Sequence, residues 1–434
     1  MPRASRVPRL GRCLRRPRWA ALALLFVTTS VLAQPPTGPI QRIYAPTSAG
    51  DPRAAGLEFD KAAEESLREA PGIHVGGFMV FPELEIGERY DDNIFATKND
   101  RESDFYTVIS PSVSVESTWS RHGLGLQAFG EFRHFAQHQT EDTEQGGVNL
   151  TGRLDISGAD YISEFLSFSR EAQERSDPDD TGSRHPPLFN HAIARTRYAH
   201  QFSDLELRID GQMERYNYLA ESDADRDRTE FAVKPRLSYL LSAHFTPFVE
   251  VGYLDRNFDS AVNQDGVDAD SRTYDATLGL GFMLDPALTG EIAVGVFHTE
   301  FDDSTLDPIT SPLIEGNLSW EVTRLTTVTG SIFHREAVTS TTDNSSQIVS
   351  SASVRIDHEL LRNVLLDGEV RYRNNDYQSS DRMDNRFDVE VGGSYLLNPN
   401  ASIALSYRYS NRISNEDEHD FTDNLVELSV LLKM

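Results

Sequence analysis

From Gly76 to its last residue, the sequence alternates apolar and polar positions in segments of about ten residues. In one segment, Leu207 and Ile209 alternate with Glu206, Arg208 and Asp210. The same alternation recurs at 148–156, 229–239, 314–322 and 387–395. A period of two is typical of a β-strand with one apolar face. The pattern therefore predicts an all-β chain.

The connections between these segments alternate between short turns and long polar loops. Short turns are expected near 120–121, 158–159, 203–204, 242–243, 286–287, 323–324, 361–362 and 399–400. Long loops rich in Asp, Glu, Asn and Ser are expected at 141–145, 171–187, 221–227, 255–271, 374–384 and 415–423. This asymmetry is typical of outer-membrane barrels. We therefore predict a transmembrane antiparallel up-and-down β-barrel of about 18 strands, with 16 or 14 as alternatives.

Aromatic residues near the strand ends fit the interfacial girdles of such a barrel. They are Trp119, Phe202, Tyr239, Phe248, Trp320 and Tyr395 by short turns, and Tyr90, Tyr216, Tyr253, Tyr372 and Tyr409 by long loops. In lipid each unpaired backbone group costs several kcal/mol, so the sheet must close on itself. A barrel of this size is too wide for side chains to fill, and its lumen must hold water or a loop.

The N-terminal residues resemble a secretory signal peptide. Seven arginines precede an apolar stretch from Trp19 to Ala33, which is shorter than the roughly 20 residues of a spanning helix. We place cleavage after Ala33, and an uncleaved anchor is the alternative. Residues 1–33 are then the signal peptide, 34–75 a flexible, proline-rich periplasmic segment, and 76–434 an outer-membrane β-barrel.

Charge and cysteine content exclude several classes of function. The net charge is −27, and removing the seven arginines of residues 1–33 makes it −34. Such a surface repels nucleic acid, so neither DNA nor RNA is expected as a partner. The only cysteine, Cys13, lies in the signal peptide. The mature chain therefore has no disulfide, thiolate metal site or cysteine nucleophile.

If the apolar face meets lipid, the charged positions between the apolar ones line the lumen. The basic and acidic lumen candidates are Arg153, Arg208, Lys234, Arg236, Arg355, Arg371, Arg373, Arg386, Glu206, Asp210, Asp367 and Glu369. An Arg or Lys on the lipid face would cost about 2–4 kcal/mol at the midplane, which supports this orientation. Such a lining either tunes the selectivity of a hydrated pore or stiffens the wall as a lattice of salt bridges.

Metal and enzyme chemistry are weakly supported. The acidic clusters Asp91–Asn93 and Asp265–Asp270 offer oxygen ligands for Ca²⁺, but neither has the spacing of a known calcium loop. We expect solvated loops there, with no metal and no cofactor. The twelve histidines are dispersed, and no Gly-x-Ser-x-Gly or zinc signature occurs. We therefore predict that the protein is not an enzyme.

Three short motifs carry a resemblance to a known family. The first contains Tyr90, Asp91, Asp92, Asn93 and Phe95, the second contains Trp119, Arg121 and His122, and the third is the run 176–180. Together they are similar to the outer-membrane β-barrel porins found in exopolysaccharide and capsule gene clusters. The resemblance covers 76–434 and implies an outer-membrane location and a role in polysaccharide export. It implies no catalytic residues.

Three functional hypotheses follow. The first is a porin-like channel in the bacterial outer membrane, a conduit in exopolysaccharide or capsule export whose partners are lipid, a polysaccharide or export machinery. The second is a non-conducting structural or adhesive barrel that binds a partner, glycan or calcium through its acidic loops. The third, which the sequence favours least, is an outer-membrane enzyme. Ion conductance in a planar bilayer distinguishes the first from the others.

Overall fold

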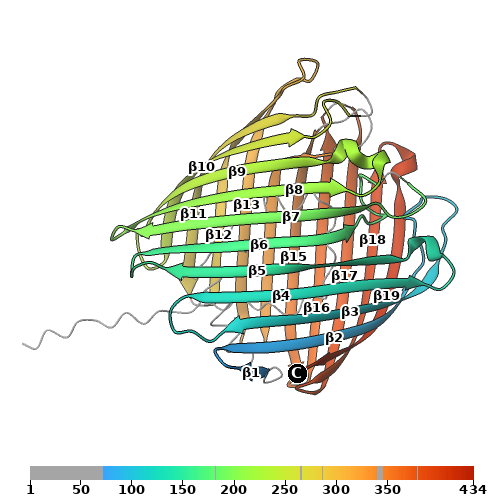
Figure 1. Cartoon of the computed structure of the whole chain (residues 1–434), viewed down its shortest axis with the longest axis horizontal. Helices are drawn as coiled ribbons and strands as arrows, with labels where there is room; N and C mark the ends of the chain where they lie inside the picture. Colours follow the sequence, from blue (N-terminus) through green and yellow to red (C-terminus); the bar gives the residue numbers. More distant parts are fainter. Residues whose placement is uncertain (1–71, 181, 264–265, 286, 340–345, 379) are drawn as a thin grey trace, which may run out of the picture.

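The computed structural model describes residues 72–434 except 181, 264–265, 286, 340–345 and 379. Its elements form one antiparallel sheet, drawn in Figure 1. The strands are β1 (Ile73–Val75), β2 (Phe78–Asp91), β3 (Asp104–Ser117), β4 (Gly123–Phe135), β5 (Thr143–Asp155), β6 (Asp160–Ala172), β7 (Leu188–Gln201), β8 (Leu205–Tyr218), β9 (Arg228–Tyr239), β10 (Phe245–Phe258), β11 (Ser271–Asp285), β12 (Leu288–Phe301), β13 (Ile309–Thr323), β14 (Thr326–Val338), β15 (Ser346–Leu361), β16 (Val364–Tyr377), β17 (Met383–Asn398), β18 (Ala401–Ser414) and β19 (Phe421–Lys433). Short 3₁₀ helices η3 (Gln139–Glu141), η4 (Glu221–Arg226) and η5 (Asp417–His419) lie in three long loops.

The sheet closes into a barrel of eighteen strands, β2 to β19. Each strand pairs with the next along the chain, and the last strand pairs with the first from Leu425 opposite Asp91 to Lys433 opposite Glu83. Closure leaves no unpaired sheet edge for lipid to meet. The predicted architecture and strand number are therefore confirmed.

Strand lengths differ from the prediction. Barrel strands have 12 to 16 residues, against the expected ten or so. The additional residues lie mainly at the end with long loops, where both faces of a strand are polar and the apolar alternation fades. The eight short connections fall where the sequence predicts them. We call the two ends the short-turn end and the long-loop end.

The N-terminal region is only partly described. Residues 1–71 include the predicted signal peptide and most of the predicted flexible segment, and they lie outside the described residues. Within 34–75 the structure describes β1, which pairs with β2 and which the sequence pattern does not predict. Among the described residues, no helix has the length and apolar character needed to cross a membrane.

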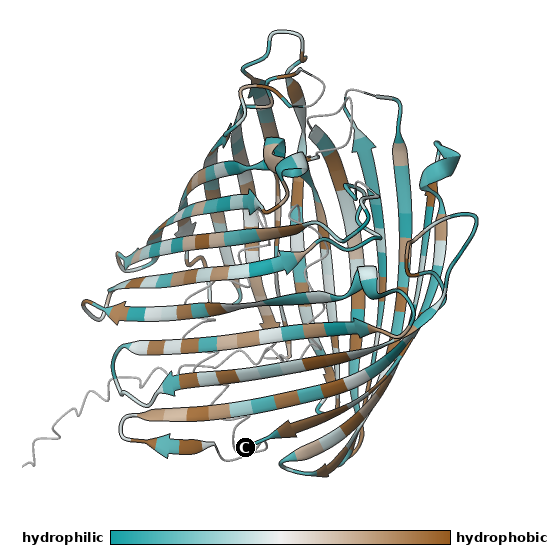
Figure 2. Cartoon of the chain, turned by 45° about the vertical axis from the view of Figure 1, so that its right-hand side comes forward, coloured by the Kyte–Doolittle hydropathy of each residue, from teal (hydrophilic) through white to brown (hydrophobic). Residues whose placement is uncertain are grey.

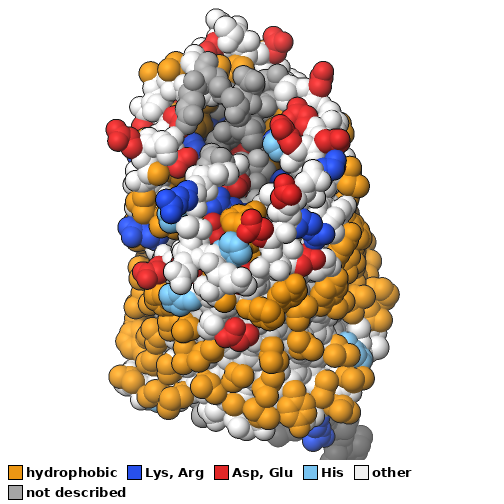
Figure 3. Space-filling model, turned by 90° about the vertical axis from the view of Figure 1, so that its right-hand side faces the viewer, with side chains coloured by type: hydrophobic (Ala, Val, Ile, Leu, Met, Phe, Trp, Pro, Cys, Tyr) orange, Lys and Arg blue, Asp and Glu red, His pale blue; other side chains and the backbone are white. Residues whose placement is uncertain are grey.

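The outer face of the barrel is apolar. Bands of apolar and polar residues alternate along the strands in Figure 2, and Figure 3 shows apolar side chains gathered over the lower part of the surface and charged ones above them. Trp119, Tyr239 and Trp320 are exposed on this face, as expected for girdle residues. Two expected girdle residues, Tyr216 and Phe248, are instead buried on the inner face.

Both of these inward-facing aromatic residues lie against arginines that also face inward. The Arg228 guanidinium lies 3.9 Å from the ring centroid of Tyr216, and that of Arg236 lies 3.2 Å from the centroid of Phe248. A cation over an aromatic face is attracted by the ring quadrupole, which accommodates the ring in a polar interior. Opposite Phe248, Gly279 leaves space for the ring, since a Cβ there would lie 2.0 Å from Cζ.

Candidate functional site

The inner face of the barrel carries the charged positions that the sequence assigns to the lumen. On each of their strands the exposed apolar residues occupy the alternate positions, so the charged ones project to the opposite face. Residues placed in this way are Arg153, Arg208, Lys234, Arg236, Arg355, Arg371, Arg373, Arg386, Glu206, Asp210, Asp367 and Glu369.

Many of these charges are paired with one another. Arg153 contacts Asp155 at 2.9 Å, and Arg355 contacts Asp357 at 2.9 Å and Asp367 at 3.4 Å. Charge-assisted hydrogen bonds of this kind hold side chains in fixed positions. Much of the lining is therefore a lattice of ion pairs, and any unpaired charge within it has a larger electrostatic influence on the lumen.

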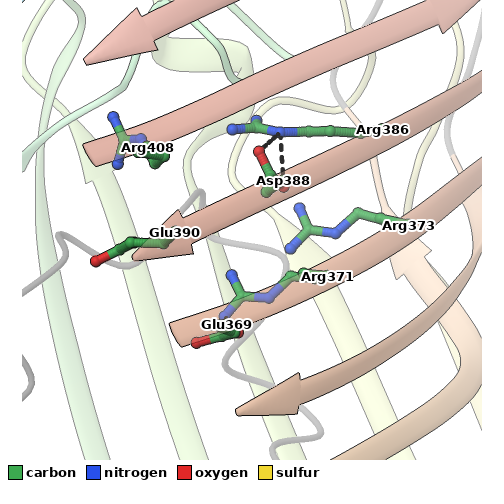
Figure 4. A pocket seen from close by; sticks show the side chains of 7 residues that line it. All are labelled: Glu369, Arg371, Arg373, Arg386, Asp388, Glu390 and Arg408. Atoms are coloured by element: carbon green, nitrogen blue, oxygen red, sulfur yellow. Dashed lines mark hydrogen bonds and ion pairs between the residues drawn. The ribbon is translucent and has the colours of Figure 1, made fainter. Parts of the chain in front are cut away.

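One side of the inner face, which we call the basic wall, is formed by β16, β17 and β18. Its charged residues surround a small cavity and are Glu369, Arg371, Arg373, Arg386, Asp388, Glu390 and Arg408 (Figure 4). Arg371 binds Glu369, and Arg386 binds Asp388 at 2.9 Å. Within the described part of the chain, Arg373 and Arg408 take part in no ion pair, and the Nε atom of each is buried without an acceptor. This wall therefore has cationic groups available for an anion.

The opposite composition occurs on β8 to β13, which we call the acidic wall. Its inward carboxylates include Glu206, Asp210, Glu214, Glu230, Glu250, Asp275, Glu291 and Glu315. They outnumber the inward cations of the same stretch, which are Arg208, Arg228, Lys234, Arg236 and Arg256 and which each form an ion pair. Arg208 binds Asp210 at 3.0 Å, Lys234 binds Asp275 at 3.9 Å, and Arg236 binds Glu291 at 2.6 Å. The lumen therefore has two sides of unlike charge.

The long loop between β6 and β7, residues 173–187, crosses the lumen. The Ser176 carbonyl oxygen accepts hydrogen bonds from Arg386 on β17 at 3.2 Å and from Arg412 on β18 at 3.4 Å. Thr339, which follows β14, donates to the Asp179 carboxylate at 2.6 Å. In the ring of eighteen strands, β14 lies eight places from β6 and β17 seven places in the other direction. Contacts with both require the loop to span the interior.

Ion pairs hold the base of this crossing loop. Both guanidinium groups involved are nearly buried: Arg175 binds Glu141 at 2.7 Å, and Arg133 binds Glu174 at 2.8 Å. Because the base is fixed at one wall and the tip hydrogen-bonded at the other, the loop narrows the passage. The size of the barrel predicts that its lumen holds water or a loop. The described residues show that a loop lies within it.

The tip of the crossing loop carries two buried carboxylates. Asp177 and Asp179 are 6% and 4% exposed. Burial, reinforced by the nearby Asp179 carboxylate, raises the pKa of Asp177 to about 6, while Arg226 and Arg373 oppose the rise. The tip therefore brings a titratable negative charge within the electrostatic reach of Arg373 on the basic wall.

A family comparison agrees with this architecture. The sequence model of the family described as "Putative beta-barrel porin 2" matches residues 68–434. The chain belongs to this family. Porins are barrel channels of the bacterial outer membrane, which is also the location that the fold indicates. No curated protein sequence shows significant similarity to the chain.

Solved porin structures are similar to this family member. The outer membrane protein OpdK of Pseudomonas aeruginosa shares 15% identity, with 82% of this chain and 99% of that chain covered and a TM-score of 0.44. OccK2 (OpdF) of the same organism, in complex with glucuronate, shares 10%, with 82% and 98% covered and a TM-score of 0.45. A BenF-like porin from Pseudomonas fluorescens Pf-5 shares 11%, with 82% and 99% covered and a TM-score of 0.45. These values are too low to transfer a solute to this family member.

The first two family-like motifs lie at the two ends of the barrel. Tyr90 is exposed on the outer face, and Asp91 ends β2 at the long-loop end. Asp92 and Asn93 bridge to β19: Asp92 accepts two hydrogen bonds from Asn424 at 2.8 Å, and Asn93 donates to the Thr422 carbonyl at 2.9 Å. This motif therefore fastens the first barrel strand to the last.

The other motif residues support neighbouring connections. Phe95 packs edge-on against His138 and beneath Arg175 at the base of the crossing loop. At the short-turn end Trp119 is exposed, and Arg121 and His122 hydrogen-bond to the backbone of the next turn at Asp155. The structure thus gives the first two motifs structural contacts, whereas the crossing loop brings the third motif, 176–180, to Arg386 of the basic wall.

Several residues of the site are absent from the sequence prediction. Thr339, Arg412, Arg133 and Glu141 all hold the crossing loop. The nearest signal in the sequence is the motif 176–180, which is family-like but as acidic as the other long loops. Asp268 and Asp270 lie in the long loop 259–270, whereas Asp265 lies outside the described residues.

Proposed function

We propose that this porin conducts anionic solutes, with acidic sugars and short acidic oligosaccharides as the class that fits the lumen. The observation that carries the proposal is the pair Arg373 and Arg408 on the basic wall: neither forms an ion pair with a described carboxylate, and the Nε atom of each is buried without an acceptor. A carboxylate accepts paired hydrogen bonds from a guanidinium, and sugar hydroxyls bind the remaining donors. In a wet lumen such contacts are weak and numerous, which allows a solute to enter and leave.

Export of an exopolysaccharide or capsule chain is the finer form of this proposal. It is supported by the family-like motifs and by the excess of acidic residues in the long loops, which disfavours capture of an acidic polymer from the medium. This electrostatic effect is short-ranged, since charges beyond about 8 Å are screened at physiological salt. The crossing loop restricts the passage, so a single extended glycan chain fits better than a folded polymer.

Planar-bilayer recording tests the proposal. We expect the purified protein to give discrete current steps and a reversal potential that shows anion preference in a salt gradient. Replacing Arg373→Gln together with Arg408→Gln should lower the anion-to-cation permeability ratio by about twofold or more, because two positive charges that form no direct ion pair leave the lumen. The matched control is Arg272→Gln with Arg121→Gln, which removes the same charge outside the basic wall. The control should leave the ratio unchanged.

Two outcomes contradict the proposal. An unchanged ratio in the Arg373 and Arg408 variant would place these residues outside the conduction path. No current from the unmodified protein would favour a non-conducting structural barrel instead. The crossing loop is the observation that favours this second candidate, since its contacts with β14, β17 and β18 would also seal a lumen.

A further inference from the structure

The junction of the first and last barrel strands contains a group of three carboxylates. Asp91 ends β2, Asp92 follows it, and Asp423 lies on β19. A carboxylate oxygen of each lies within 4.8 Å of one from each of the others. The sequence places Asp423 more than 330 residues from the other two, so closure of the barrel alone creates this group.

Asp423 gives a second observation, independent of the clustering. Its side chain is 7% exposed, and its Oδ1 atom is buried without a hydrogen-bond donor in the described structure. A buried carboxylate oxygen without a donor costs free energy unless a cation or a proton compensates it. The donors that bind this group are directed to the other two carboxylates: the Asn93 backbone N–H donates to Asp91 at 2.7 Å, and both Asn424 donors bind Asp92.

The protein's own cations do not neutralise this group. Arg101 contacts Asp92 at 2.9 Å, which leaves Asp91 and Asp423 facing each other. Arg408 attracts both carboxylates, but no ion pair joins it to either of them in the described part of the chain, and its Nε atom also lacks an acceptor. Three carboxylates thus meet one directly bound guanidinium, so a bound cation or a shared proton is needed to compensate them.

We propose that Asp91, Asp92 and Asp423 bind a calcium ion that clamps the β2–β19 junction at the long-loop end. Calcium takes six to eight oxygen ligands at about 2.3–2.6 Å in variable geometry, which suits carboxylates from two strands and a loop with water from the lumen. Magnesium requires a stricter octahedron and fits this irregular set less well. Three carboxylates, partly neutralised by Arg101, indicate an affinity of about 10⁻⁴–10⁻³ M, as in extracellular modules.

Calorimetric titration of the refolded full chain with CaCl₂ tests the site. Refolding from denaturant in detergent, followed by chelator treatment, removes lipopolysaccharide, which itself binds divalent cations. We expect a one-site isotherm for the unmodified protein and binding at least about tenfold weaker for Asp423→Asn. Calcium should also raise the thermal unfolding midpoint of the unmodified protein and not that of Asp423→Asn.

A neighbouring acidic cluster supplies the matched control. Glu416, which precedes η5, and Glu418 and His419 within it also bring three candidate ligands together, but both glutamates are exposed. Glu416→Gln with Glu418→Gln should leave the isotherm unchanged. Loss of binding in this control, with binding retained in Asp423→Asn, would overturn the assignment. The assignment would also be overturned if the unmodified protein bound no calcium and Asp423→Asn were more heat-stable than the unmodified protein. Asp91 and Asp423 would then share a proton instead of binding a cation.

Discussion

The two sides of the lumen are built from the same strand pattern and differ in how their charges are compensated. On the acidic wall, Lys234 and Arg236 are each bound by a carboxylate, and further carboxylates remain. On the basic wall, Arg373 and Arg408 are left without one. Counting charged residues along each strand would miss this contrast. Under the proposed function, an anion moves along β16–β18 and the crossing loop controls access to that path.

The largest effect is expected from removing the crossing loop. Replacing residues 174–186 with a short Gly-Ser linker should raise single-channel conductance several-fold, because the loop spans the lumen from β6 to β14, β17 and β18. It should also increase anion preference, since the carboxylates of Asp177 and Asp179 leave the basic wall. Single-channel recording measures both quantities.

The control for this prediction is the loop between β12 and β13. Its Asp303 accepts a hydrogen bond from the adjacent loop at Asp268. Replacing residues 303–307 with a linker should leave conductance unchanged. Equal conductance for the two loop variants would show that the crossing loop does not limit flow.

Neutralising the acidic wall should have a smaller effect, opposite in sign to that of neutralising the basic wall. Glu250→Gln with Glu315→Gln removes two negative charges from β10 and β13, so the reversal potential should shift toward anion preference. The Arg373 and Arg408 variant on the basic wall should shift it toward cations. The acidic-wall shift should be the smaller because Lys234 and Arg208 already offset these carboxylates. Shifts of equal sign in the two variants would refute the division into two walls.

The contrast between the walls also marks how far the sequence could predict the site. Period-two alternation places Arg371 and Arg373 inside, because a strand exposes successive residues on opposite faces. Pairing across strands depends on register, which alternation alone does not specify. Arg236 and Glu291, for example, meet across 55 residues of chain. The sequence therefore predicts which charges are inside without predicting which of them stay uncompensated.

The crossing loop is the part of the fold that the sequence pattern misses. Its composition is that of a solvated loop, and its contacts join residues 160 to 236 positions apart. The run 176–180 stands out as a family-like motif, yet nothing local in it specifies the partners Thr339, Arg386 and Arg412. The prediction that Tyr216 and Phe248 belong to the interfacial girdles is wrong for a related reason. The arginines that stack on them inside the barrel come from neighbouring strands, and the alternation within one strand says nothing about such contacts.

The smallest effect concerns pH and the tip of the crossing loop. Burial beside Asp179 raises the pKa of Asp177 to about 6, above the ordinary value of a solvated aspartate near 3.8. Between these two values the docked loop binds more protons than an undocked one, so docking weakens as pH rises through about 6. We expect hydrogen exchange of residues 174–180 to be slower at pH 5 than at pH 7, after correction for intrinsic rates.

The variant Asp177→Asn tests whether this carboxyl is the group responsible. It should remove the pH dependence of exchange in residues 174–180, while Asp180→Asn, on the same loop but bound to Arg175, should retain it. Anion preference should follow the same titration: it should be greater at pH 5, where Asp177 is neutral and Arg373 loses a nearby negative charge, than at pH 7. If the anion preference of Asp177→Asn changed between pH 5 and pH 7 to the same extent as that of the unmodified protein, the titrating group would be a different one. The basic wall would then be independent of the loop tip.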